Sequence, residues 1–218
     1  MRACLSLIRL SFKRARFIFT LPILLGYLII PAVSSAAYRS FGLSRCLETI
    51  SYATHALIPI CAVLWGMAYL QMWIDNDGQE TIRACSRGKQ TCAFALFFLM
   101  LCLTVILLPI YLVAHFLVGY STSEYIKVFA EMIFSVSMLY FISLVSRTVS
   151  VGIITVIAYL LFCVFFSGNA VFTKYCLINP SSTAEFEDVI SRYFPLVLLS
   201  LLLGIISHFY ERCLYRKY

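Results

Sequence analysis

Residues 92–119 read CAFALFFLMLCLTVILLPIYLVAHFLVG and contain no charged side chain. A transmembrane helix needs about 20 mainly apolar residues to cross roughly 30 Å of hydrocarbon, so this run is long enough to span a bilayer with some tilt. Five more apolar runs occupy residues 17–37, 52–74, 125–146, 149–168 and 194–210. Together the six runs predict an all-α, polytopic membrane protein with six transmembrane helices.

The composition supports this class and leaves room for only one domain. Hydrophobic residues make up 62% of the 218 residues and charged residues 12%, whereas soluble domains have about 45–50% apolar and about 25% charged residues. A short chain cannot hide so much apolar surface in one core surrounded by water. Because the stretches between the runs are short, we expect residues 1–218 to form a single transmembrane domain.

The positions of the cations predict that both termini lie in the cytoplasm. With the N-terminus inside, the outer side carries Arg39, Arg45, Lys127, Lys174 and Arg192, which leaves twelve of the 17 Lys and Arg residues on the cytoplasmic side. Such an excess of cytoplasmic cations is the usual determinant of orientation. Residues 75–91 then form a cytoplasmic loop and residues 169–193 an extracytoplasmic connection. These flanks account for the net charge of +7, so no nucleic-acid partner is expected.

Two interpretations of the N-terminal segment, residues 1–16, stay open. Its cations among Leu, Ile and Phe suit a helix lying in the cytoplasmic interface of the membrane, close to anionic headgroups. They equally suit a plain basic flank for the first span. Residues 17–37 with Ser34-Ser35-Ala36 also resemble a cleavable signal peptide, but the length of the run and the polytopic remainder favour an uncleaved span.

A search for catalytic or metal-binding groups finds no pattern in the sequence. His55, His115 and His208 lie on three different predicted helices without a second ligand three or four residues away, and neither HExxH nor GxSxG occurs. We interpret each histidine as a hydrogen-bonding residue at a helix interface, and expect no catalytic residue, metal ion or cofactor. Cys46 and Cys176 both fall on the outer side, so one disulfide between them stays open.

Glu131 is the acid that lies well inside an apolar run. Burying a carboxylate there costs on the order of 3 kcal/mol, so acids within spans tend to be paired or functional. One interpretation pairs Glu131 with Lys127, one turn earlier, or places it at the outer interface. The other has Glu131 lining a substrate path.

The loop after the second span, DNDGQETIRACSRGKQ (residues 75–90), is longer than a turn requires. Glu80 through Cys85 is compatible with a short helix that has acids near its start and Arg87 and Lys89 beyond its end, as the helix dipole favours. The loop is either a solvated connector or a helix that receives force from a soluble partner.

Taken in order along the whole chain, these features resemble the permease subunit of type-2 ABC exporters. The basic N-terminal segment, the loop at residues 75–90, the turn SLVSRTVS at residues 143–150 and the polar connection with Asn179-Pro180 each resemble a feature of that family. The family's coupling-helix region often opens with Glu and Gly and ends in Ser or Arg before a Lys. This loop lacks the usual Pro before its Ser/Arg element.

The resemblance implies that the chain is not an enzyme, and no GxxxxGK[ST] phosphate-binding loop occurs in it. A separate ATP-binding cassette subunit is then the energy source, and two permease subunits, as a homodimer or heterodimer, form the pathway. The implied location is the bacterial cytoplasmic membrane, where the chain is in contact with membrane lipid. The implied cargo is an amphiphilic peptide, drug or lipid. The residues implied at the contact with the ATPase are Gln79, Glu80, Arg83 and Ser86.

Other functions stay open beside this one. The chain could serve as an accessory or sensor membrane subunit without transport, or as an intramembrane enzyme that uses Glu131 and the histidines. An ion-coupled carrier is a further class, but residues 1–110 and 111–218 show no convincing internal repeat of the kind found in many such carriers.

Overall fold

The computed structural model of the chain describes residues 12–13, 15–75, 92–167, 169, 176 and 186–215. Within these ranges it has α2 (Arg16–Leu24), a π-helical turn (Leu25–Ile29), α3 (Ile30–Phe41), α4 (Leu43–Ile74), α6 (Cys92–Val118), α7 (Thr122–Ser146), α8 (Val149–Phe166) and α9 (Phe186–Tyr215), and no strand. Among the described residues six helical stretches are long and apolar enough to cross a membrane, the first formed by α2, the π-helical turn and α3 together. The chain is an all-α, polytopic membrane protein, as predicted.

The helix boundaries differ from the predicted spans mainly at two N-terminal ends. We predicted the second span from residue 52, but α4 already begins at Leu43. We placed residues 186–193 in the outer connection, but they form the first turns of α9. The reason is physical: an apolar run reports only the part of a helix that suits hydrocarbon, whereas the backbone hydrogen bonds continue the helix into the polar interface.

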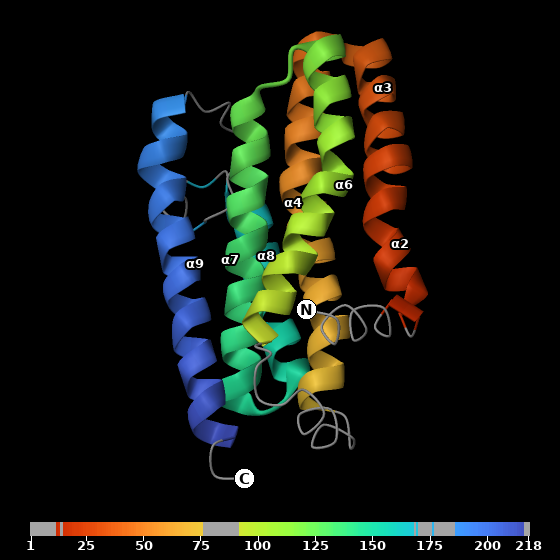
Figure 1. Ribbon diagram of the computed structural model, residues 1–218. Helices are drawn as coiled ribbons and strands as arrows, with labels where there is room; N and C mark the ends of the chain where they lie inside the picture. Colours follow the sequence, from red (N-terminus) through yellow and green to blue (C-terminus); the bar gives the residue numbers. More distant parts are fainter. Residues whose placement is uncertain are drawn as a thin grey trace.

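The centre of the bundle is formed by α4 and α7. In the membrane-spanning part of each helix, 72% of the α4 residues and 61% of the α7 residues are buried, against 22–33% for the other four spans. Figure 1 shows α9 at one edge of the bundle beside α7, and α2 and α3 at the opposite edge. We therefore expect buried polar or charged side chains with a functional role to lie mainly on α4 and α7.

The helices alternate in direction, which gives the bundle two distinct ends (Figure 1). One end, called here the Asp75 end, holds the start of α2, the end of α4, the α7–α8 turn and the end of α9. The other, called the Gly119 end, holds the α3–α4 and α6–α7 turns, where Gly42 and Gly119 adopt positive φ angles of 84° and 70°. Glycine reaches such angles without steric cost, which allows the chain to reverse direction sharply between the two helices of each turn.

Prolines inside the spans leave carbonyl groups that other helices satisfy. Because Pro22 has no N–H, the carbonyl of Ile18 has no helical donor, and the Trp65 indole on α4 donates to it at 3.1 Å. On α6, the Tyr27 hydroxyl donates to the Ile106 carbonyl at 2.6 Å, one residue after Val105, whose carbonyl lacks a helical donor because of Pro109. Unsatisfied backbone groups are costly in lipid, so these bonds fix the first span against α4 and α6.

The predicted tight hairpin between the fourth and fifth spans is confirmed. The α7 helix ends at Ser146, Arg147 adopts a left-handed conformation with φ 57°, and α8 begins at Val149. Gly152 then lies so close to α7 that an added Cβ atom would come within 3.2 Å of the Leu139 carbonyl oxygen and would also collide with the Ser143 hydroxyl.

We therefore expect Gly152→Ala to destabilise the folded protein by about 1–3 kcal/mol, the usual cost of overpacking a tight contact. The control is Gly204→Ala on α9, where an added Cβ meets no atom within 4 Å and the gain in helix propensity is about 0.5–1 kcal/mol. Thermal unfolding in detergent, followed by circular dichroism, measures both. Equal melting temperatures for the two variants would show that the close α7–α8 approach is absent.

Candidate functional site

Four charged or titratable side chains meet inside the bundle between α4 and α7. His55 on α4 contacts a Glu124 carboxylate oxygen through Nε2 at 2.7 Å and a Glu131 oxygen through Nδ1 at 2.7 Å. The Lys127 ammonium donates to both oxygens of Glu124 at 3.0 Å. None of these side chains is more than 2% exposed. We call these four residues the histidine network.

The sequence places the network through helical periodicity. Glu124, Lys127 and Glu131 are separated by three and four residues, so they share one face of α7. Ser121 caps this helix by accepting a hydrogen bond from the Ser123 backbone N–H at 3.2 Å. Glu124 therefore lies in the first turn, where the helix dipole favours an acid. The network begins beside the Gly119 end and reaches two turns into α7.

The two histidine contacts together require two hydrogens. Each nitrogen of His55 lies 2.7 Å from a carboxylate oxygen, a distance that fits a charge-assisted hydrogen bond with one proton between the atoms. Either His55 is an imidazolium between two carboxylates, or a neutral His55 donates to Glu124 and accepts from protonated Glu131. With the Lys127 ammonium included, the network has zero net charge in both arrangements, as a low-dielectric interior favours.

One oxygen of the network has no hydrogen-bond partner among the described residues. It is the buried Glu131 Oε1, and the buried Tyr111 hydroxyl on α6 likewise has no partner in that part of the chain. Tyr111 lies within electrostatic reach of Glu131 and Glu124. Beside it, Tyr120 in the α6–α7 connection approaches the Thr54 hydroxyl at 3.4 Å. Burial raises the pKa of the Tyr120 phenol, so the phenol stays a neutral hydrogen-bonding group.

A second polar cluster joins three helices at the Asp75 end. Glu211 on α9 accepts hydrogen bonds from the Trp73 indole of α4 at 2.5 Å and from the Tyr140 hydroxyl of α7 at 2.6 Å. The Glu211 side chain is buried. Because a carboxylate in an apolar interior is stabilised only by donors around it, this arrangement holds the ends of α4, α7 and α9 together.

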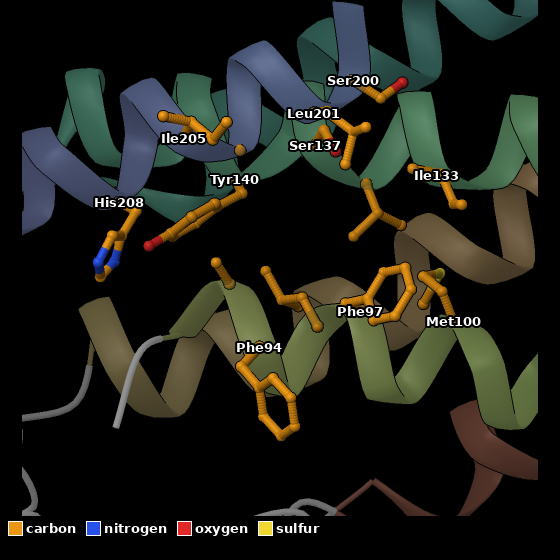
Figure 2. A pocket seen from close by; sticks show the side chains of 14 residues that line it. Phe94, Phe97, Met100, Ile133, Ser137, Tyr140, Ser200, Leu201, Ile205 and His208 are labelled. Atoms are coloured by element: carbon orange, nitrogen blue, oxygen red, sulfur yellow. The ribbon is translucent and has the colours of Figure 1, made fainter. Parts of the chain in front are cut away.

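An apolar cleft of about 360 Å³ opens between α6 and α9, with α7 as its floor. Figure 2 shows Phe97 and Met100 of α6 on one side of this space and Leu201 and Ile205 of α9 on the other. Its few polar groups include Ser137, Ser200, Tyr140 and His208. The cleft combines a wide apolar wall with hydroxyl and imidazole groups, which suits a molecule with apolar and polar parts.

The structure corrects the partner predicted for Glu131 and the place predicted for Lys127. Glu131 pairs with His55 rather than with Lys127, and it does not reach the outer interface. Lys127, which we counted among the outer cations, is fully buried and paired with Glu124. The reason is that α4 covers this face of α7 and inserts the His55 ring between Glu124 and Glu131. Sequence analysis missed Glu124 and Glu211 because both lie at or beyond the edges of the apolar runs.

The histidines fulfil the prediction in one case of three. His55 joins two helices, as we expected of every histidine. His115 instead donates from Nδ1 to the backbone carbonyl of Tyr120 at 2.8 Å, in the connection that follows its own helix. His208 lines the cleft, and its buried Nδ1 has no hydrogen-bond partner in the described part of the chain.

The predicted cysteine pair is not joined by a disulfide, and the predicted ATPase contact residues are not among the described residues. Cys46 and Cys176 are buried, and no disulfide joins them. The predicted contact residues Gln79, Glu80, Arg83 and Ser86 lie outside the described residues, as do most of residues 1–16. Among the described residues, no group of three or more His, Cys, Asp or Glu side chains is arranged to hold a metal ion.

Comparison with known proteins adds no relative. No protein-family model matches the chain, and neither the curated proteins nor the solved structures include a significant match. The fold itself defines a class, a multi-pass membrane protein, through the six helices among the described residues that are long and apolar enough to span a bilayer.

Proposed function

We propose that the chain is the membrane-spanning permease subunit of an ATP-driven ABC exporter, working as one of a pair in the bacterial cytoplasmic membrane. In this proposal a separate ATP-binding subunit docks on the loop between α4 and α6, and the Asp75 end faces the cytoplasm. The support for the orientation is the excess of Lys and Arg on this side of the spans. The support for a pair is size, because α4 and α7 are the most buried spans and occupy the centre of the described bundle.

The observation that carries the proposal is the attachment of this loop to two helices. The loop leaves α4 at Asp75, and Asp75 Oδ1 accepts a hydrogen bond from the Val149 backbone N–H at 3.3 Å. Val149 is the first residue of α8, where the helix dipole also favours an acid. A push on the loop therefore acts on the end of α4 and the start of α8 together, as coupling to a soluble motor requires.

The proposed cargo is amphiphilic, and the α6–α9 cleft supports this. The cleft is open to the side of the bundle and is bordered by Phe94 and Leu201, which are 56% and 51% exposed. In a bilayer such side chains face the acyl chains, so a peptide, drug or lipid dissolved in the membrane has direct access from the side.

We expect the double variant Glu80→Ala/Arg83→Ala to lose coupling to the ATPase while still inserting in the membrane. The full chain is purified by affinity from its native membrane, and magnesium-dependent ATP hydrolysis by the eluate is measured. The wild type is expected to carry ATPase activity, and the double variant to lose at least nine tenths of it.

The matched control is Arg45→Ala/Glu48→Ala. This pair forms an exposed ion pair of 2.7 Å on α4, at the Gly119 end, so it removes the same two charges from the opposite side of the membrane. The control is expected to keep the ATPase activity of the wild type. The proposal fails if the wild-type eluate hydrolyses no ATP, or if labelling places Arg83 on the outer surface.

A further inference from the structure

The histidine network has a property that the export function does not explain. Four ionisable side chains are buried together at a cost that intramembrane proteins usually accept only at functional sites. A network built only for stability would satisfy every oxygen, since a half-satisfied polar group in a core is worse than an apolar one. Here Glu131 Oε1 has no hydrogen-bond partner within the part of the chain that the structure describes, and neither has the nearby Tyr111 hydroxyl.

We infer that the histidine network is a proton-binding site that holds one exchangeable proton between His55 and Glu131, and that losing this proton loosens the contact between α4 and α7. This inference does not depend on the proposed export function. Its ligand is the proton itself. The structure shows the loaded state, because both 2.7 Å contacts of His55 require a hydrogen.

The chemistry of release is a simple proton transfer. The bond that breaks is the O–H bond of Glu131 or the Nδ1–H bond of His55, whichever holds the shared proton. The proton goes to water or a buffer base. The charge of the network then changes from zero to −1. Neutral His55 then has only one N–H, which it donates to Glu124 or to Glu131, but not to both. The other ring nitrogen presents a lone pair to a carboxylate oxygen, and repulsion opens a contact that joins α4 to α7.

The surroundings leave the His55–Glu131 pair as the part of the network that changes charge. Lys127 holds both oxygens of Glu124, so Glu124 remains the ionised partner. Among the described residues, three phenols from further elements also lie near the network. They are Tyr111 on α6, Tyr120 in the α6–α7 connection, and the Tyr193 ring of α9, whose centre lies 5.8 Å from the Lys127 ammonium. A phenol hydroxyl both donates and accepts a hydrogen bond, so these groups add hydrogen-bonding capacity beside the network.

Within the network, a proton is passed inward from Glu124, the member nearest the Gly119 end. Glu124 belongs to the first turn of α7, and its carboxylate contacts His55 directly. In the released state with neutral His55 protonated on Nδ1, a proton from Glu124 binds Nε2 while the Nδ1 proton moves to Glu131, so one proton travels inward and the imidazole is neutral again. Glu131 is the inner end of this relay.

The test is a difference titration of the purified full chain in detergent. Wild type and Glu131→Gln are titrated from about pH 5 to about pH 10, and the protons released are counted. We expect the wild type to release one proton more than Glu131→Gln, because the glutamine amide donates to His55 without titrating. The control Glu48→Gln removes an exposed carboxylate of the same helix that lies outside the network, so it is expected to match the wild type in the proton release of the network. Coincident curves for wild type and Glu131→Gln overturn the inference.

A second measurement needs no variant. Hydrogen exchange of wild-type α4 peptides around His55 is compared with that of α8 peptides, after correction for the intrinsic effect of pH. We expect exchange around His55 to rise about tenfold or more over the pH interval of proton release, the factor expected from losing one charge-assisted hydrogen bond. If α4 and α8 peptides follow the same pH dependence, the network does not couple protonation to the α4–α7 contact and the inference is wrong.

Discussion

Replacing Lys127 with methionine is expected to destabilise the folded bundle by about 3–5 kcal/mol, the usual cost of removing one partner of a buried ion pair. Methionine has a similar length and fills the space, so the loss comes from charge rather than from a cavity. The ammonium of Lys127 is the donor to both oxygens of Glu124. Without it, the network of His55 and two glutamates can no longer be neutral with both carboxylates ionised.

Unfolding of the variant in mixed detergent micelles, followed by circular dichroism, measures this loss. The matched control is Arg45→Met, which breaks an ion pair of the same i, i+3 spacing on the surface of α4. An exposed pair contributes only about 0–1 kcal/mol, so the control is expected to unfold like the wild type. The double variant Lys127→Met/Glu124→Gln is expected to regain part of the lost stability, because it also removes the unpaired charge. Equal unfolding of Lys127→Met and Arg45→Met would contradict a buried network.

The six spans were predictable because their physical cause is local. Each run has to be apolar over the thickness of the hydrocarbon, and that requirement can be read from consecutive residues such as 92–119. The hairpin at Arg147 was predictable for the same reason, because two apolar runs nearly touch there. The starts of α4 and α9 were not, since residues 43–51 and 186–193 are helical without being uniformly apolar.

Only one member of the histidine network, Glu131, was identified from the sequence as a buried functional candidate. Glu131 was singled out because an acid inside a span is expensive. Its partner His55 comes from a helix 76 positions earlier in the chain, and no local pattern tells which spans pack together. The spacing of Glu124, Lys127 and Glu131 on one face of α7 was the available signal. It was overlooked because Glu124 lies just before the apolar run and therefore resembled a surface residue.

The two polar clusters connect α7 to its neighbouring helices at both ends of the bundle. The histidine network ties α7 to α4 near the Gly119 end, whereas Glu211 ties α7 to α4 and α9 at the Asp75 end. Opening one end without the other turns α4 against α7 about the cluster that remains closed. If the Gly119 end opens in the exporter proposed above, the Glu211 cluster still joins α4 to α7 and is the expected pivot of that motion.

Replacing Glu211 with leucine is therefore expected to have the second large effect, a loss of about 2–4 kcal/mol in the free energy of unfolding. The Trp73 indole and the Tyr140 hydroxyl each lose the acceptor that they have in the wild type. A buried donor that loses its acceptor costs about 1–3 kcal/mol, and leucine recovers part of this by adding apolar surface in a lipid environment. Thermal unfolding of the variant by circular dichroism gives the value.

Glutamine at position 211 is the control that separates hydrogen bonding from charge. Its amide oxygen still accepts from one donor, and its amide N–H donates to the Tyr140 oxygen, so Glu211→Gln is expected to lose at most about 1 kcal/mol. Tyr140→Phe removes one of the two donors and should fall between the two variants. If Glu211→Leu is as stable as Glu211→Gln, the cluster does not hold α9 against α4 and α7, and a pivot at the Asp75 end has no physical basis.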